Sequence, residues 1–143
     1  MSVETMIATA RSFYQGAYRC NQSLPGDSYD ARKLIVPAVV CHAFSLEVYL
    51  KFLLKISMNI ESREHDLKTL YKMLDESTRN EIETKVGYEK FIFENNIDLF
   101  KKAFIEWRYF YEEGNAKVVN LEFVRKMVEA IEDIVQRSGF PYP

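Results

Sequence analysis

Residues 42–55 of the chain read HAFSLEVYLKFLLK, a helical pattern in which one glutamate stands among apolar residues. At about 100° per residue, the helix predicted for residues 32–58 has one main apolar stripe. The stripe consists of Val36, Val39, Val40, Ala43, Leu46, Leu50, Leu53 and Leu54. Glu47 falls inside it, between Ala43 and Leu50. We therefore expect Glu47 to face the protein core or its edge.

A buried carboxylate needs a cation or hydrogen-bond donors nearby, because removing an unpaired charge from water is unfavourable. Lys51, four residues on, is one candidate partner of Glu47. Arg108 is the other, because it flanks the apolar stripe of the helix predicted for residues 89–112. Glu47, Lys51 and Arg108 are thus predicted to form a polar site. This site either holds the fold together or acts on a ligand.

The opposite side of the same helix has a second apolar strip, made of Cys41, Phe44, Val48 and Phe52. A helix that is apolar on two sides is either central in its own bundle or shared with another chain. We therefore predict a homodimer formed through this helix.

The segment 34–54 has the length of a membrane span. Glu47 and Lys51 oppose insertion, since charged side chains are unfavourable at the centre of a spanning helix. Pro37 and His42 add to this effect. We therefore expect a buried core helix and no membrane contact.

The remaining pattern is also helical, and no alternating strand pattern competes with it. Ser2 and Asn120 are available as N-caps of the first and last helices, and Gly139 ends the last one. The predicted helices cover residues 2–18, 32–58, 65–74, 77–86 (opened by Ser77), 89–112 and 121–138, the segment 77–86 being the weakest. The sequence predicts one all-α domain over residues 1–143. Its architecture is expected to be a compact up-and-down helical bundle of four to five main helices with short connections.

The composition of the chain argues against several classes of function. The chain has 143 residues and a formal net charge of −2, so no global positive field draws it to nucleic acid or to anionic membrane. Its two cysteines, Cys20 and Cys41, lie outside any zinc-type spacing and fit a reducing compartment. The first residues do not resemble a secretory signal, so a cytoplasmic location is expected. Without a Gly-rich phosphate loop or a His/Cys cluster, no cofactor and no metal are expected.

Three motifs, in this order, resemble the HEPN group (higher eukaryotes and prokaryotes nucleotide-binding). They are AFSLEVYLKFLLK at residues 43–55, HDLKTLYKML at 65–74 and FIEWRYFYEEG at 104–114. The group often shows a Leu-Glu-x-x-Leu-Lys helix, a His-Asp-Leu turn and a late arginine. The resemblance implies a compact helical bundle, frequent homodimerisation and a setting in toxin–antitoxin or phage-defence systems. A cognate antitoxin is then an expected partner.

Active members of that group are metal-independent ribonucleases with an Arg-x4-6-His motif, in which arginine steadies the phosphate and histidine moves protons. After Arg108 no histidine follows at the positions that the motif allows, which hold Glu113, Gly114 and Asn115. Asn115 forms hydrogen bonds but does not transfer protons near neutral pH. Enzymatic activity is therefore uncertain from the sequence.

Two hypotheses follow. The first is a non-catalytic HEPN-like module that dimerises and binds a partner protein, nucleotide or RNA. The second is a divergent ribonuclease that uses Arg108 with His65 or Asn115.

The simpler interpretation of His65 is that it caps the short third helix or binds neighbouring backbone. His42 is expected on a polar side of its helix with Ser45 and Tyr49, without the groups that a nucleophile site needs. The acidic pair Glu132–Asp133 is expected on a solvated helix face.

Overall fold

The structure is a computed structural model that describes residues 1–22, 32–101, 106–107 and 120–143. Within these residues the chain forms six helices and no strand, which confirms the all-α prediction. The helices are α1 (Val3–Cys20), α2 (Arg32–Met58), α3 (Leu67–Met73), α4 (Glu76–Val86), α5 (Lys90–Phe100) and α8 (Leu121–Arg137).

The helix starts follow from side-chain caps. Ser2 accepts a hydrogen bond from the backbone of Thr5, and Asn120 caps α8 as predicted. Helix α4 begins at a different cap from the one that the sequence indicated. Asp75, not Ser77, caps it, because the Asp75 carboxylate accepts from both the backbone N–H (3.0 Å) and the hydroxyl (2.7 Å) of Thr78.

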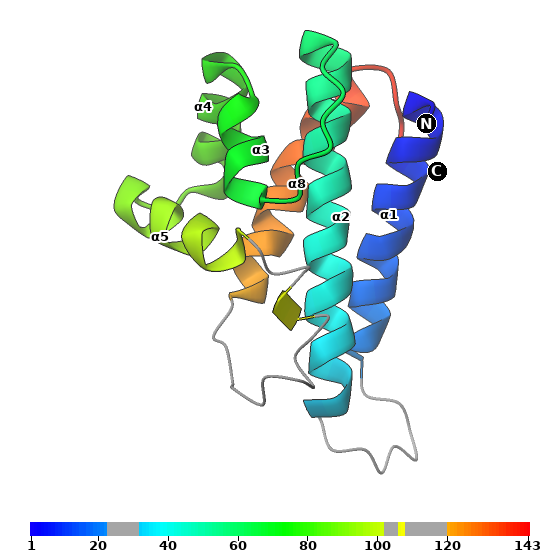
Figure 1. Cartoon of the computed structure of the whole chain (residues 1–143), viewed down its shortest axis with the longest axis vertical. Coiled ribbons are helices and arrows are strands. Elements are labelled where there is room, and N and C mark those ends of the chain that lie inside the picture. Colours follow the sequence, from blue (N-terminus) through cyan, green and yellow to red (C-terminus); the bar gives the residue numbers. More distant parts are fainter. Residues whose placement is uncertain (23–31, 102–105, 108–119) are drawn as a thin grey trace.

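The three long helices α1, α2 and α8 stand side by side, and α3, α4 and α5 form a smaller group against one side of them (Figure 1). Helix α2 contacts α1, α3 and α8, and α4 packs on α8. Helix α5 runs across the long helices instead of along them (Figure 1). One continuous cluster of buried apolar side chains includes residues from all six helices.

Helix α2 is the centre of this core. Ala43, Leu46 and Leu50 of its predicted main stripe are 0–1% exposed. The second apolar strip is partly covered within the chain, since Phe44 packs edge-on against Phe13 of α1 and Phe52 packs against Phe140. Packing inside one chain therefore buries Val48 and Phe52 of the second strip and leaves Cys41 and Phe44 half-buried. A homodimer stays a prediction.

The helix predicted for residues 89–112 falls partly outside the described residues. Its first part is α5, and Glu106 and Trp107 are also helical. The buried members of its predicted stripe are Phe93, Ile97, Phe100 and Trp107. Phe104, Arg108 and Tyr111 lie outside the described residues, as does Asn115.

The segment Leu34–Met58 is long and apolar enough to cross a membrane by length and composition. In the structure it is the central core helix, and Val39, Leu53 and Leu54 are fully buried against other helices. The apolar composition of this segment therefore serves packing in the bundle.

Candidate functional site

The chain reverses direction at the end of α2, and this turn places the candidate site. Asn59 adopts a left-handed conformation (φ 53°). Its N–H donates to the carbonyl of Lys55 (3.1 Å), and the N–H of Ile60 donates to that of Leu54 (3.1 Å). This is the hydrogen-bond pattern of a left-handed C-cap. The loop then runs back along α2 towards α3 (Figure 1), so its residues lie beside the last turns of α2.

The side chain of Glu47 lies under this returning loop and is 1% exposed. Its Oε1 accepts hydrogen bonds from Lys51 Nζ (2.8 Å) and from His65 Nδ1 (2.8 Å). The predicted Glu47–Lys51 pair is thus confirmed. A carboxylate oxygen only accepts, so Nδ1 of His65 donates, and in this tautomer of the uncharged ring Nε2 is an acceptor. His65 is 57% exposed at its side chain, which leaves the ring accessible from solvent.

The prediction that His65 caps the third helix is wrong. Asp66 is the cap of α3 and accepts from the backbone of Thr69 (3.0 Å). The carboxylate of Glu64 accepts from the backbone N–H of His65 (2.8 Å) and of Asp66 (2.9 Å). With these backbone groups already paired, the ring of His65 turns to Glu47 across 18 residues of sequence.

The second oxygen of Glu47 is different. Oε2 is buried and has no hydrogen-bond partner among the described residues. A buried acceptor without a donor is unfavourable by about 1–3 kcal/mol. Arg108, the other predicted partner of Glu47, lies outside the described residues, so the Glu47–Arg108 pair stays a prediction.

A pocket of about 470 Å³ opens beside Glu47. Its polar wall combines cations and carboxylates, and Lys55 pairs with Glu61 there (2.9 Å). Its apolar wall comes from α1, α2 and the returning loop. The pocket is lined by Met1, Met6, Phe44, Glu47, Val48, Lys51, Lys55, Ile60, Glu61, Ser62, Arg63 and His65. We call it the Glu47 pocket.

No protein-family model, curated protein or solved structure matches this chain. The resemblance to the HEPN group therefore stays a prediction.

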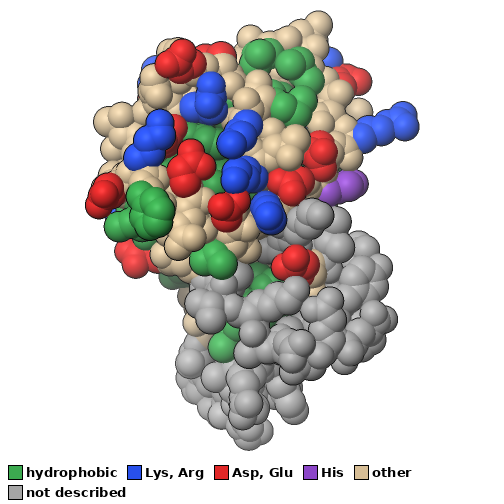
Figure 2. All heavy atoms as spheres, turned by 60° about the vertical axis from the view of Figure 1, so that its left-hand side comes forward, with side chains coloured by type: hydrophobic (Ala, Val, Ile, Leu, Met, Phe, Trp, Pro, Cys, Tyr) green, Lys and Arg blue, Asp and Glu red, His purple; other side chains and the backbone are tan. Residues whose placement is uncertain are grey.

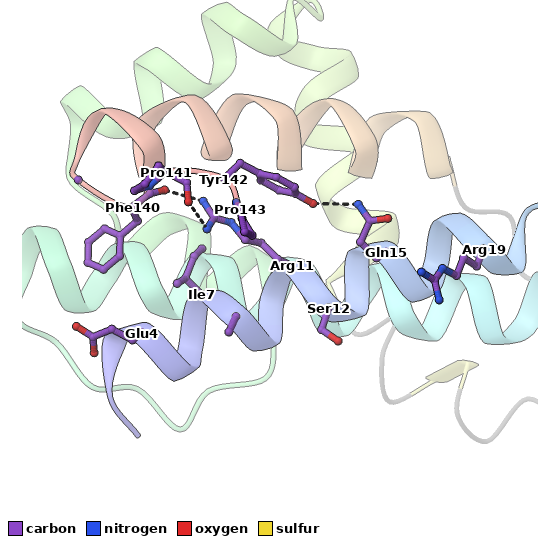
Figure 3. Close-up of a pocket in the computed structure, with 12 residues that line it drawn as sticks. Glu4, Ile7, Arg11, Ser12, Gln15, Arg19, Phe140, Pro141, Tyr142 and Pro143 are labelled. Carbon is purple, nitrogen blue, oxygen red and sulfur yellow. Dashed lines mark hydrogen bonds between the residues drawn. The ribbon is translucent and has the colours of Figure 1, made fainter.

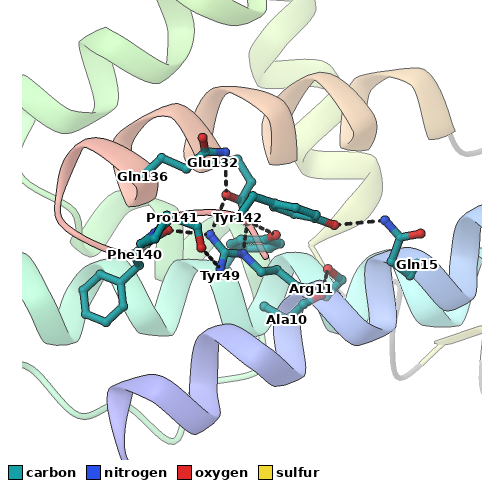
Figure 4. Close-up of polar contacts among 10 residues, drawn as sticks. Ala10, Arg11, Gln15, Tyr49, Glu132, Gln136, Phe140, Pro141 and Tyr142 are labelled. Atoms are coloured by element: carbon teal, nitrogen blue, oxygen red, sulfur yellow. Dashed lines mark hydrogen bonds and ion pairs between the residues drawn. The ribbon is translucent and has the colours of Figure 1, made fainter.

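A second polar cluster joins α1, α2 and α8 (Figure 4). Arg11 holds Glu132 through two bonds, Nε to Oε1 (2.7 Å) and Nη2 to Oε2 (3.0 Å). Tyr49 donates to the same carboxylate (2.5 Å). Burial alone would raise the pKa of Glu132, but the hydrogen bonds from Arg11 and Tyr49 outweigh it and lower that pKa below its ordinary value.

The expectation that Glu132 is solvated is therefore wrong, whereas its neighbour Asp133 is exposed and pairs with Lys85 (3.1 Å). The signal was present in the sequence. Glu132 lies four residues after Val128 and three before Val135, inside the apolar stripe of α8.

Arg11 also holds the segment that follows α8. Its guanidinium donates to the carbonyls of Phe140 (2.7 Å) and Pro141 (3.0 Å), and Gln15 donates to the hydroxyl of Tyr142 (2.9 Å). A pocket of about 660 Å³ lies between this segment and α1 (Figure 3). Because Glu132 neutralises Arg11, the polar groups at this pocket serve mainly to dock residues 140–142.

The predicted polar side of α2 is also buried. His42, Ser45 and Tyr49 are 0–5% exposed, and Ser45 donates to the carbonyl of Ala10 (2.7 Å). His42 packs edge-on against Tyr14, its Nδ1 has no partner among the described residues, and burial lowers its pKa to about 4. These contacts give no nucleophile arrangement.

Charges on the side formed by α3, α4 and α5 are mixed. Figure 2 shows Lys and Arg side chains interspersed with Asp and Glu on this face. Several are paired, for example Lys68 with Asp98 (2.6 Å) and Arg137 with Glu81 (2.6 Å). An extended basic surface for nucleic acid is therefore not formed by the described residues of this face.

Proposed function

We propose that the chain is a non-catalytic HEPN-like module that binds a nucleotide in the Glu47 pocket. The observation that carries the proposal is the arrangement around Glu47. One buried carboxylate holds Lys51 and His65 side by side at the wall of a pocket that is also partly apolar.

The charge of the pocket supports an anionic ligand. Among the side chains of the pocket, Lys51, Lys55 and Arg63 stand against Glu47 and Glu61, which gives a formal charge of +1 without His65. Glu47 is buried beneath its two partners, so the cations are nearer to a bound anion than its carboxylate is. A phosphate group would gain charge-assisted hydrogen bonds from these side chains.

The apolar wall and the size of the pocket support a ligand with a flat organic body. Met6, Phe44, Val48 and Ile60 provide the wall. The volume of about 470 Å³ lies in the range of pockets for small ligands and cofactors. A nucleotide combines such a body with a phosphate.

A direct binding measurement tests this function. We expect AMP, GMP, CMP or UMP to bind saturably by calorimetry and to raise the melting temperature of the protein. Arg63→Gln should weaken binding several-fold, while Lys68→Gln, which removes a cation outside the pocket, should not. If none of the four nucleotides binds saturably at millimolar concentration, the proposal is refuted.

One observation favours the second candidate, a divergent metal-independent ribonuclease that uses Arg108. Glu47 orients His65 through Nδ1, so Nε2 is presented as a proton acceptor, as in carboxylate-histidine pairs that act as general bases. The test is cleavage of varied RNA in the presence of EDTA. Cleavage that is lost in both His65→Gln and Arg108→Ala, while both variants still fold, would establish ribonuclease activity and overturn the proposal of a non-catalytic module. Asn115→Ala tests the other predicted partner of Arg108 in the same assay.

The resemblance to the HEPN group is the basis on which we propose a partner protein. A cognate antitoxin encoded beside this chain, for example a small nucleotidyltransferase-like protein, would support a toxin–antitoxin setting. Co-expression followed by size-exclusion chromatography tests it, and a neighbour that does not co-elute with the chain would count against this partner.

A further inference from the structure

The free oxygen of Glu47 bears on which nucleotide the pocket takes. Glu47 is 1% exposed, lines the pocket, and is satisfied at Oε1 alone among the described residues. Buried polar atoms in folded proteins nearly always have a partner, so an unpartnered one at a pocket wall indicates a missing donor.

The two oxygens are not equivalent. Oε1 already accepts from Lys51 and from His65, which fills its lone pairs. A ligand therefore has one free acceptor atom, Oε2, and not a two-oxygen fork.

We propose that Oε2 accepts a hydrogen bond from the exocyclic amine of a nucleobase, and that the pocket thereby selects adenine or cytosine nucleotides. This inference rests on the proposed function. The apolar wall, which includes Val48 and Ile60, takes the face of the base, and the phosphate lies towards Lys55 and Arg63.

The other bases fit a single free oxygen less well. Guanine presents two adjacent N–H groups that suit a carboxylate with both oxygens available. Uracil presents a ring N–H between two carbonyl oxygens, and hypoxanthine presents a ring N–H beside one carbonyl oxygen. In both bases a carbonyl oxygen would approach the carboxylate and repel it. An amine without a neighbouring ring N–H avoids both problems. A buried acceptor that is designed for a donor discriminates strongly against ligands that lack it.

Three probes that differ at one position of the base test this inference. AMP carries the 6-amine, purine riboside 5′-monophosphate carries hydrogen there, and IMP carries a carbonyl. Calorimetry should give at least tenfold weaker binding for the second and third probes than for AMP.

The variant Glu47→Gln keeps the size of the side chain and can replace the free acceptor by an amide donor. It should lose the preference for AMP and shift it towards IMP. Glu129→Gln, which changes an exposed carboxylate of α8 outside the pocket, should keep the AMP preference and serves as the control.

The outcomes separate the two levels of the proposal. Equal affinity of the wild-type protein for all three probes overturns amine recognition and leaves nucleotide binding standing. Absence of binding of every nucleotide overturns both. The wild-type comparison needs no variant, so it decides the question even where Glu47→Gln does not fold.

Discussion

At the scale of single residues, three buried ionisable side chains are accommodated in three ways. Glu47 shares one oxygen between Lys51 and His65. Glu132 is held on both oxygens. His42 has no charged partner and is neutral at physiological pH, because burial lowers its pKa to about 4. These differences give distinct expectations for stability.

Arg11 and Glu132 form a buried pair, so removing one partner should be strongly destabilising. We expect Arg11→Met to lower the free energy of unfolding by about 3–5 kcal/mol, since the Glu132 carboxylate is then left in the core. Urea denaturation measures this. Arg125→Met, which breaks an exposed pair with Glu129, should change stability by less than about 1 kcal/mol. Similar small effects for both variants would contradict the structural role of Arg11.

His42 should make the protein acid-sensitive. Its folded-state pKa of about 4 lies below the ordinary value near 6.5, so the unfolded chain binds the proton more tightly. The stability contributed by the neutral ring is complete above pH 6.5 and is lost as pH falls from there towards 4. Between pH 7.5 and 5 this amounts to about 2 kcal/mol.

Urea denaturation measures the free energy of unfolding across that pH range. As the pH falls, this free energy should decrease less for His42→Leu than for the wild-type protein. This range lies above the ordinary pKa of carboxylates, so their titration contributes little. If the free energy of unfolding of His42→Leu depends on pH as it does for the wild-type protein, the ring is not buried in its neutral form.

At the scale of elements, α2 and the turn that ends it set the geometry of the Glu47 pocket. Asn59 is the one non-glycine residue among the described residues with positive φ. Asparagine tolerates this conformation, whereas a β-branched side chain does not.

We expect Asn59→Val to lower the free energy of unfolding by about 1–2 kcal/mol. Asn59→Gly, which relieves the strain, should be neutral or slightly stabilising. Chemical denaturation of the two variants tests this pair, and equal effects would argue against a left-handed residue at this turn. Because the turn directs the loop towards Glu47, Asn59→Val should also weaken nucleotide binding.

At the scale of the whole molecule, fewer residues of α2 are available for the predicted homodimer than the sequence indicated. Val48 and Phe52 of the second strip are buried within the chain. Cys41 and Phe44 are half-buried, so they are the part of the strip that a second copy could still cover.

We expect light scattering at micromolar concentration to give the mass of two chains. Cys41→Lys should shift the protein to the mass of one chain, because it places a charge at the contact. Phe91→Lys is the control on α5, where the phenylalanine is 77% exposed, and it should leave the dimer intact. A single-chain mass for the wild-type protein would rule out this dimer.

The sequence by itself determined the all-α class, the bounds of α1, α2, α3, α4 and α8 to within a few residues, the caps Ser2 and Asn120, and the inward position and Lys51 partner of Glu47. All of these depend on interactions within about one helical turn, which repeat with a fixed period. For the weaker helix α4 the sequence indicated the wrong cap, and for α5 it determined the start but not the end.

Only the tertiary structure decided that His65 joins Glu47, that Arg11 holds Glu132 across 121 residues of sequence, and that His42 lies buried against Tyr14. These contacts join different elements, so they depend on how helices cross and on where a loop returns. A helical period shows which side of one helix faces inward. It does not show which side chain of another helix, or of a loop, will be there.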